Sequence, residues 1–390
     1  MKKKLWIPAV LLTLVLTLVS TLAGCAALQT STSSTTSSNG TATTSTLASN
    51  SIPASVSGLE TALESIYSQV NPSVVSIQVI LAASSTSLGG SAQGSGFVWD
   101  TNGDIVTNNH VIDGSTRTTV TFYDGTTVDA TLVGTDADSD LAVIKVNPAG
   151  LQLQPVTVAD STLVKVGQVA VAIGNPFGLQ NTMTVGFVSA VGRLIPANIN
   201  AVGATYSIPD IIQTDVSINP GNSGGVLLDD TGAVIGVTQS IDTTSGSSSG
   251  VGFAIPSAII KQVVPELIQN GHYDHPYLGI SVTSLTPDLA TAMNLPSGQR
   301  GALVQTVTSG GPADKAGLKA STNNTSINGQ QYNVGGDVII AYNGQTIKSS
   351  DDLITFMARS GSVGQVVTLT ILRGGNQIQV QVTLGLRPSS

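Results

Sequence analysis

Short apolar runs rich in valine, isoleucine and threonine follow one another closely from residue 74 to about residue 255. Turn-forming pairs such as Asn102-Gly103 and Asp124-Gly125 separate these runs, and no helical stretch lies between them. A parallel sheet needs a long crossover, usually a helix, between its strands, so this spacing argues against one. The pattern predicts a mostly β structure built from antiparallel barrels or a sandwich.

The length and charge of the chain limit its architecture and its partners. Its 390 residues allow about two domains plus tails, at the usual ~150 residues per domain. The net charge is −8, and it becomes −11 if the three lysines at positions 2–4 leave with a cleaved leader that holds no acidic residue. A chain this acidic repels a phosphate backbone, so we expect no nucleic-acid partner.

Cysteine and histidine are too scarce for most metal sites. Cys25 is the only cysteine, which excludes an intramolecular disulfide and any site with several cysteine ligands. The three histidines are His110, His272 and His275, and the last two lie in a polar connector. We therefore predict no metal site and no cofactor.

The first 25 residues have the pattern of an export signal. Lysines at positions 2–4 precede an apolar stretch at residues 5–19, and Leu22-Ala23-Gly24 leads directly to Cys25. These last four residues resemble the bacterial lipobox, in which the cysteine is lipidated and becomes the mature N-terminus. Residues 5–24 also have about the ~20-residue length of a transmembrane helix, so an uncleaved membrane anchor is the alternative. Both interpretations place the rest of the chain outside the cytoplasm, in a bacterial cell envelope.

Composition separates a tether from the folded part of the chain. Residues 26–55 are almost entirely Ser, Thr, Ala and Asn, without charge, and cannot bury enough surface to fold. Ser57 and Glu60 form a capping-box pair that begins a helix, and Asn71-Pro72 ends it. The predicted boundaries are 1–24 for the signal peptide, 25–56 for the disordered tether, 57–270 for the first domain and 271–390 for the second.

A second helix is predicted where the first domain ends. Apolar residues at helical spacing indicate a helix over Ser257–Asn270, which Pro265 should kink and Gly271 should end. In the second domain, the polar residues 320–334 should form a hairpin around Asn328-Gly329.

The turn Asn219-Pro220-Gly221-Asn222-Ser223-Gly224-Gly225 sets one serine among three glycines. A tight turn of this kind can expose Ser223 Oγ and aim backbone N–H groups at one point, as nucleophilic attack on a carbonyl requires. An ordinary surface loop is the alternative. A serine hydroxyl also needs a base within reach, and His110 is the only histidine of the first domain.

An imidazole that acts as a base needs a carboxylate that holds its tautomer. Asp140 opens the apolar strand Leu141-Ala142-Val143-Ile144, which can fix its side chain, so we choose Asp140 and place Asp138 second. The other candidates are Asp113, Asp124, Asp129 and Asp136.

The order His110, Asp140, Ser223 and the residues around each of them resemble the HtrA family, the DegP-like or Do-like serine proteases with a chymotrypsin-like fold. The resemblance covers about residues 57–386 and implies two six-stranded antiparallel β-barrels with this triad in the cleft between them. It also assigns the oxyanion hole to the backbone N–H groups of Gly221 and Ser223, with Asn222 as a third candidate. Further similar segments are Gly174-Asn175-Pro176-Phe177-Gly178, Gln213-Thr214-Asp215 and Val251-Gly252-Phe253-Ala254-Ile255-Pro256.

The same resemblance suggests which residues select the substrate. Ser217, six residues before Ser223, takes the place at the base of the pocket for the residue before the cut, and Gly236 and Thr238 complete this specificity pocket. Because Ser217 carries no charge, we expect cleavage after small or medium aliphatic residues such as Val, Ala or Ile. Residues 236–240 should offer a strand edge on which an extended substrate pairs.

The second domain resembles an α+β PDZ domain, and an ordinary turn at its start is the alternative. The resemblance implies that a peptide C-terminus binds at Tyr277, Leu278, Gly279 and Ile280. In that arrangement the Leu278-Gly279 loop holds the carboxylate, and Ile280 begins the strand on which the peptide pairs. The segments that carry the resemblance are Gly310-Gly311-Pro312-Ala313, Ala316-Gly317-Leu318 and Gly336-Asp337-Val338-Ile339.

Together these patterns predict an ATP-independent serine endopeptidase of envelope protein quality control. It would cleave unfolded or misfolded exported proteins while its PDZ domain binds peptide C-termini. The resemblance also implies a homotrimer, and lipidated Cys25 or an uncleaved N-terminal helix would hold it at the membrane. The alternative is a chaperone-type, scaffold-type or regulatory homologue with little general proteolysis.

Overall fold

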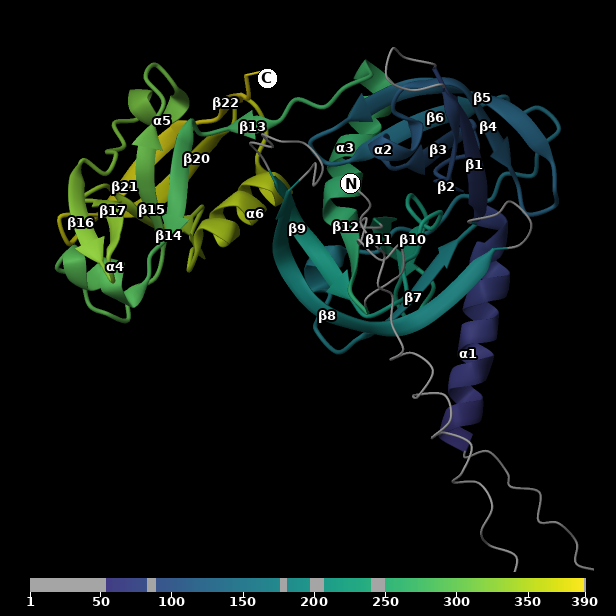
Figure 1. Ribbon diagram of the computed structural model, residues 1–390, viewed down its shortest axis with the longest axis horizontal. Helices are drawn as coiled ribbons and strands as arrows, with labels where there is room; N and C mark the ends of the chain where they lie inside the picture. The colour runs from purple at the N-terminus through teal and green to yellow at the C-terminus, as the bar shows by residue number, and fades with distance from the viewer. Residues whose placement is uncertain (1–53, 83–88, 176–180, 197–206, 240–249, 389–390) are drawn as a thin grey trace, which may run out of the picture. The chain divides into compact units, whose positions relative to one another are not determined.

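Six strands between residues 74 and 146 close into an antiparallel barrel in the computed structural model (Figure 1). Their order around the barrel is β1-β2-β3-β6-β5-β4. The tight turns at Gly103 and Gly125 join neighbouring strands, as the sequence pattern predicted. The strands are β1 (Val74–Leu81), β2 (Gly90–Val98), β3 (Asp104–Thr107), β4 (Ser115–Thr121), β5 (Thr127–Asp136) and β6 (Leu141–Val146).

A second closed barrel repeats this connectivity, with the order β10-β11-β12-β9-β8-β7 (Figure 1). The expectation of two six-stranded antiparallel barrels is confirmed. The structure describes residues 54–82, 89–175, 181–196, 207–239 and 250–388. The strands of this barrel are β7 (Val169–Gly174), β8 (Thr182–Pro196), β9 (Ser207–Thr214), β10 (Val226–Leu228), β11 (Val234–Gln239) and β12 (Gly252–Pro256).

The two barrels share one hydrophobic core. Val74, Phe97 and Leu141 of the first barrel pack in the same buried cluster as Val171 and Val226 of the second. This cluster fixes the barrels against each other through apolar burial, which is the largest favourable term in folding. A site that takes residues from both barrels therefore has a rigid framework where the two barrels meet.

One helix precedes the double barrel in the sequence, and another follows it. Helix α1 (Ala54–Val70) begins three residues before the predicted start and is followed by a 3-10 turn at Asn71–Ser73. Helix α3 (Ser257–Asn270) has the predicted bounds, continues past Pro265, and packs on β5 and β6 as well as on β11. Gly271 ends it in a left-handed conformation (φ 78°), with its N–H donating to the Leu267 carbonyl.

The remaining residues form a separate β-sheet with short helices and a hydrophobic core of their own. The sheet order is β14-β15-β18-β20-β21, so β14 lies at one edge of the sheet. A two-stranded ribbon of β13 (Pro276–Tyr277) and β22 (Gly385–Leu386) begins and ends this unit. The other elements are β14 (Ile280–Ser284), α4 (Pro287–Ala292), β15 (Ala302–Val307), α5 (Pro312–Lys315), β18 (Val338–Tyr342), β19 (Gln345–Thr346), α6 (Ser350–Ser360), β20 (Val366–Arg373) and β21 (Asn376–Thr383).

The polar insert forms the hairpin that its sequence predicts. β16 (Asn323–Ile327) and β17 (Gln330–Val334) pair with each other in a separate two-stranded sheet. Asn328 and Gly329 connect them with φ angles of 52° and 81°. Two successive positive φ angles are typical of a type I′ turn, for which Asn-Gly is the preferred sequence.

The predicted signal peptide, Cys25 and nearly all of the tether lie outside the described residues. Within the part of the chain that is described, no helix combines the length and the apolar character that crossing a membrane requires.

Gly103 and Gly125, which both lie in turns of the first barrel, allow a matched test of how closely the backbone packs at Gly103. Both have positive φ, +94° at Gly103 and +85° at Gly125, but only a side chain at Gly103 would meet the Val146 carbonyl far inside van der Waals distance. Gly125→Ala should lower the free energy of unfolding by about 1–2 kcal/mol from backbone strain. Gly103→Ala should cost at least ~1–3 kcal/mol more, because the ladder between β3 and β6 must move. Urea denaturation measures both, and equal losses would contradict the close packing at Gly103.

Candidate active site

His110 and Asp140 form a hydrogen-bonded pair at the edge of the first barrel. His110 lies on the one-turn helix α2 (Asn109–Ile112), directly after β3, and Asp140 directly precedes β6. His110 Nδ1 lies 2.7 Å from Asp140 Oδ2, and the His110 backbone N–H donates to Asp140 Oδ1 over 2.9 Å. An ionised carboxylate only accepts, so the Nδ1 proton stays on the ring and Nε2 has the lone pair that a base needs.

The backbone of Asp140 is held as firmly as its side chain. Its carbonyl accepts from the Asn108 side-chain amide over 2.9 Å and from the Asn109 N–H over 3.1 Å. Asp140 has a φ of 53°, an uncommon angle for a residue with a side chain, and it is buried. The strained angle is kept because Asn108 and the first residues of α2 bind both the carbonyl and the carboxylate of Asp140.

Ser223 belongs to the second barrel, but its turn packs on the first. The Ser95 N–H of β2 donates to the Ser223 carbonyl over 2.8 Å, and Ser95 Oγ donates to the Gly221 carbonyl over 2.6 Å. A side-chain carbon on Gly94 would lie 2.6 Å from Val111, the residue after His110, and 3.2 Å from the Ser223 carbonyl. The structure therefore brings the predicted nucleophile and the histidine segment to the same end of β2.

Positive φ angles give the nucleophile turn its shape. Gly221 has a φ of +92° and Gly224 a φ of +85°, and a side chain on Gly224 would collide with the Ser95 carbonyl and with Thr107 Oγ1. Only glycine fits at Gly224, because both the backbone angle and the close approach exclude a Cβ atom.

One of the three oxyanion candidates is already engaged within the turn. The Asn222 N–H donates to the Asn219 carbonyl over 2.9 Å, so it is not available to bind an oxyanion in this conformation. The Asn222 carbonyl in turn accepts from Thr238 Oγ1 over 2.6 Å and from the Gly225 N–H over 3.0 Å. The roles of Gly221 and Ser223 in the oxyanion hole stay predictions.

The residues predicted to select the substrate lie in three different environments. Ser217 is exposed, and its carbonyl accepts from Thr184 Oγ1 over 3.1 Å. Gly236 is buried in the barrel wall, where β11 pairs with β10 and with β12. Thr238 is also buried, and its hydroxyl supports the nucleophile turn.

The predicted free strand edge at residues 236–240 is wrong for its first three residues. Gly236 and Val237 pair on both sides, with β10 and β12. Thr238 pairs with Ala254 on one side, and on the other it exchanges backbone hydrogen bonds with Gly224 and Gly225. The closed barrel consumes the backbone groups that a substrate would need, and Ser240 lies outside the described residues.

The predicted peptide site of the C-terminal unit lies at the sheet edge formed by β14. Leu278 is buried, and its carbonyl accepts from the Ala313 N–H over 2.9 Å. Gly279 has a φ of +77°, and its carbonyl accepts from the Thr308 N–H over 2.8 Å. The Tyr277 hydroxyl lies 3.1 Å from the Thr308 hydroxyl. Ile280 begins β14. The loop therefore turns its carbonyls into the fold, and no hydrogen bond among the described residues uses the N–H groups of Leu278 and Gly279.

Comparisons with known proteins agree with this geometry. The family model of the trypsin-like peptidase domain matches residues 94–237, and that of the PDZ domain matches residues 276–384. A solved structure of the HtrA-type protease AlgW with tripeptide has a TM-score of 0.65 and 33% identity, over 84% of this chain and 98% of that one. The chain belongs to the HtrA family of serine proteases with a PDZ domain.

Curated HtrA relatives are similar over the same part of the chain. Protease Do-like 1, chloroplastic, from Arabidopsis thaliana is 42% identical over 295 residues, which are 76% of this chain and 64% of that protein. A probable periplasmic serine endoprotease DegP-like from Brucella suis biovar 1 is 40% identical over 298 residues, 76% of this chain and 53% of that protein. This chain therefore spans between half and two thirds of the length of these relatives.

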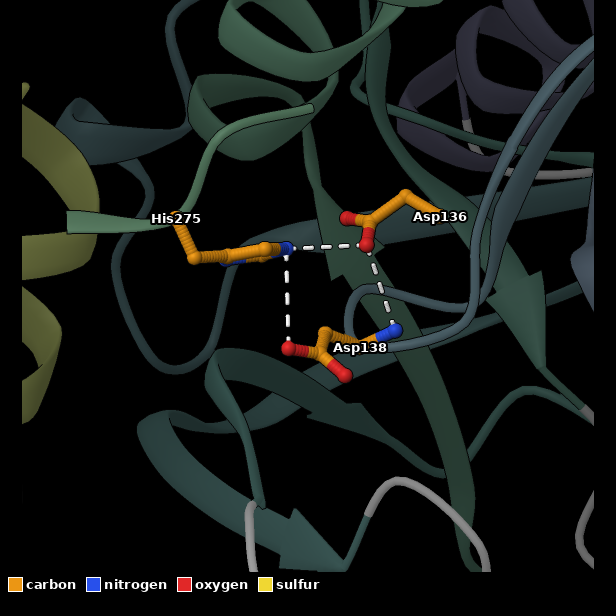
Figure 2. Close-up of side chains that lie close together, drawn as sticks. All are labelled: Asp136, Asp138 and His275. Carbon is orange, nitrogen blue, oxygen red and sulfur yellow. Dashed lines mark hydrogen bonds and ion pairs between the residues drawn. The ribbon is translucent and has the colours of Figure 1, made fainter. Parts of the chain in front are cut away.

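In this HtrA protein a cluster of charged side chains lies beside the segment that carries Asp140. Figure 2 shows His275, from the connector after α3, directed at Asp136 and Asp138. His275 Nε2 lies 2.8 Å from Asp136 Oδ1 and 3.8 Å from Asp138 Oδ2. Arg387, directly after β22, binds Asp138 through its guanidinium group. The carboxylate of Asp138 is therefore bound by Arg387, whereas that of Asp140 binds His110.

Asp136, Asp138 and His275 are residue types that bind metal ions, and their ligand atoms all lie within 4.8 Å of one another. Their bonds favour a structural role instead. Asp136 also accepts from Ser139 Oγ, which closes the turn, and the guanidinium of Arg387 already supplies Asp138 with a cation. Tyr273 packs edge-on against His275 at 4.8 Å, and burial, together with the charge of Asp136, raises the pKa of Tyr273. Sequence reasoning missed this cluster because His275 is 139 residues from Asp136.

Removing Asp136 should destabilise the protein, because its carboxylate accepts from Ser139 and His275 in a buried position. Asp136→Ala should lower the free energy of unfolding by about 1.5–3 kcal/mol, the usual range for hydrogen bonds to a charged group. Asp129→Ala is the matched control, since Asp129 pairs with Arg117 on the exposed surface and should change stability little. Urea denaturation of both variants would refute the structural role of Asp136 if the two midpoints moved equally.

Proposed function

We propose that this protein is an active serine endopeptidase that cleaves unfolded polypeptides outside the cytoplasm. The observation that carries the proposal is the His110–Asp140 pair, held at 2.7 Å at the end of the barrel on which the Ser223 turn packs. Histidine and carboxylate come from one barrel and the serine from the other. This is the division of residues that a two-barrel protease uses.

The reaction follows from these groups. His110 Nε2 takes the proton of Ser223 Oγ as that oxygen attacks the substrate carbonyl, and Asp140 stabilises the imidazolium that forms. The proton then passes to the leaving amine as the peptide bond breaks, which leaves an acyl group on Ser223. Water hydrolyses this ester in a second step, with His110 again as the base. The N–H groups of Gly221 and Ser223 are the proposed donors to the oxyanion.

The substrate class is proposed from the character of the binding residues. The pocket for the residue before the cut contains Ser217, which has no charge to pair with lysine or arginine. The PDZ domain would add a second contact, through the N–H groups of Leu278 and Gly279 to a peptide C-terminal carboxylate and through the edge of β14 to the peptide backbone. Backbone pairing tolerates many sequences but needs an extended chain, which favours unfolded proteins as substrates.

The cellular setting is proposed from the N-terminal sequence and from the relatives. Several relatives carry the name of periplasmic serine endoproteases, and residues 1–25 have an export pattern with a lipobox-like end. We place the catalytic domain outside the cytoplasm, anchored by lipidated Cys25 or by an uncleaved N-terminal helix. The homotrimer implied by the family resemblance is part of this proposal.

Digestion of casein by the wild type and by Ser223→Ala tests the catalytic proposal. The wild type should degrade casein without ATP, and Ser223→Ala should lose activity by a factor of at least ~10⁴, because the nucleophile is gone. Ser326→Ala, in the exposed hairpin of the PDZ domain, is the control and should retain full activity. Equal inertness of the wild type and Ser223→Ala would instead support the chaperone or scaffold alternative.

Peptide substrates that differ only in the residue before the cut test the specificity. Those with Val, Ala or Ile should have a kcat/KM at least ~10-fold above those with Lys, Arg or Asp, because a charge in an uncharged pocket loses its hydration without a partner. The comparison is made at one pH and one salt concentration, since exposed charges are screened by salt. A preference for arginine would contradict the assignment of Ser217.

A further inference from the structure

Two neighbouring side chains at the end of β11 contact the two halves of the active site. Thr238 Oγ1 donates to the Asn222 carbonyl in the nucleophile turn over 2.6 Å. Gln239 Nε2 donates to Asp140 Oδ2 over 3.0 Å, although Asp140 belongs to the other barrel. Through two consecutive residues this strand is bonded both to the serine segment and to the carboxylate.

The contact with Asp140 fixes the orientation of the Gln239 side-chain amide. Its Nε2 faces the carboxylate because Asp140 accepts and cannot donate when ionised, which fixes which end of the amide is the donor. Gln239 is buried, and among the described residues no hydrogen bond reaches its buried Oε1. A buried carbonyl without a partner is unfavourable, so a leucine or methionine of similar size would serve packing better. Among the described residues, the contact with Asp140 is the one feature that accounts for an amide in this place.

We infer that Gln239 is a positioning residue for catalysis, acting on His110 through Asp140. This inference rests on the proposed peptidase function. Asp140 Oδ1 is fixed by the His110 backbone N–H, and Oδ2 receives both His110 Nδ1 and Gln239 Nε2. Three donors on two oxygens hold the plane of the carboxylate in line with the imidazole. The amide also takes part of the negative charge of Oδ2, which moderates the basicity of His110.

The position in β11 adds a geometric role. Thr238 pairs through its backbone with Gly224 and Gly225, so β11 cannot shift without moving the Ser223 turn. Because Gln239 is the next residue, any movement of that turn changes the distance from its amide to Asp140. The pair Thr238-Gln239 therefore sets the separation between the nucleophile and the His110–Asp140 pair, which lie on different barrels.

Gln239→Met tests the inference, because methionine keeps the length and volume of the side chain but has no donor. On a peptide cleaved by the wild type, kcat should fall about 10- to 100-fold, the loss expected for a hydrogen bond to a charged group, while KM changes little. The acid limb of the kcat/KM profile should move to higher pH, since a carboxylate with one donor fewer favours protonated His110 more strongly. Gln78→Met, on the exposed part of β1, is the matched control and should resemble the wild type.

Gln239→Glu provides a second variant of nearly the same shape. An added carboxylate beside Asp140 should move the acid limb upward by about one pH unit when it is ionised. Thermal melting and titration of active sites separate these effects from misfolding. Unchanged kcat and an unmoved pH profile in both variants would overturn the inference. If activity fell only in proportion to the number of intact active sites and the pH profile did not move, Gln239 would have a packing role. That result would overturn the inference as well. An inert wild type would refute the peptidase proposal itself.

Discussion

The hydrogen bond from the Ser95 N–H to the Ser223 carbonyl joins the two barrels at the predicted nucleophile. The contact requires the serine turn to lie directly on β2, and Gly94 and Gly224 are the residues that allow the two backbones to meet. The Ser95 hydroxyl extends the same link, because it donates to the Gly221 carbonyl and accepts from the Asn175 N–H over 2.8 Å. The glycines of the turn thus serve the approach of two backbones as well as the shape of the turn.

Buried aspartates recur in a chain with few charges, and each has a specific partner. Asp104 accepts from Lys145 at 2.9 Å beside the turn of the first barrel, and Asp337 accepts from Arg373 in the core of the PDZ domain. Asp210 on β9 binds Arg359 on α6, and burial raises the pKa of Asp210 while Arg359 opposes that rise. Since a raised pKa means that the folded state binds the proton more tightly, ionisation of Asp210 opposes folding as the pH rises through its pKa. Arg359 is therefore required where Asp210 is charged and buried.

The features that could be predicted from the sequence are those with a local chemical signature. Gly271 ends α3 because glycine accepts a left-handed angle, and Asn328-Gly329 forms its hairpin for the same reason. The placement of Asp140 before β6 follows from a polar residue at the start of an apolar run. Gln239 has no such signature, because an amide in a strand looks like any polar residue until its partner is known. The pairing of Thr238 with the Ser223 turn had no local signature either, since it joins two segments that are apart in the sequence.

The turn that presents Asp140 is not built by the protease barrels alone. Asp136 and Asp138 lie four and two residues before Asp140, and they bind His275 and Arg387. These two residues flank the β13–β22 ribbon at which the PDZ domain begins and ends, and the Arg387 N–H also donates to the His275 carbonyl over 3.0 Å. One hydrogen-bonded chain thus runs from the ribbon through two carboxylates to the segment that ends in Asp140. Ser139 also bonds back to Asp136 within this segment. The contacts that hold the segment before Asp140 therefore include residues at both boundaries of the PDZ domain.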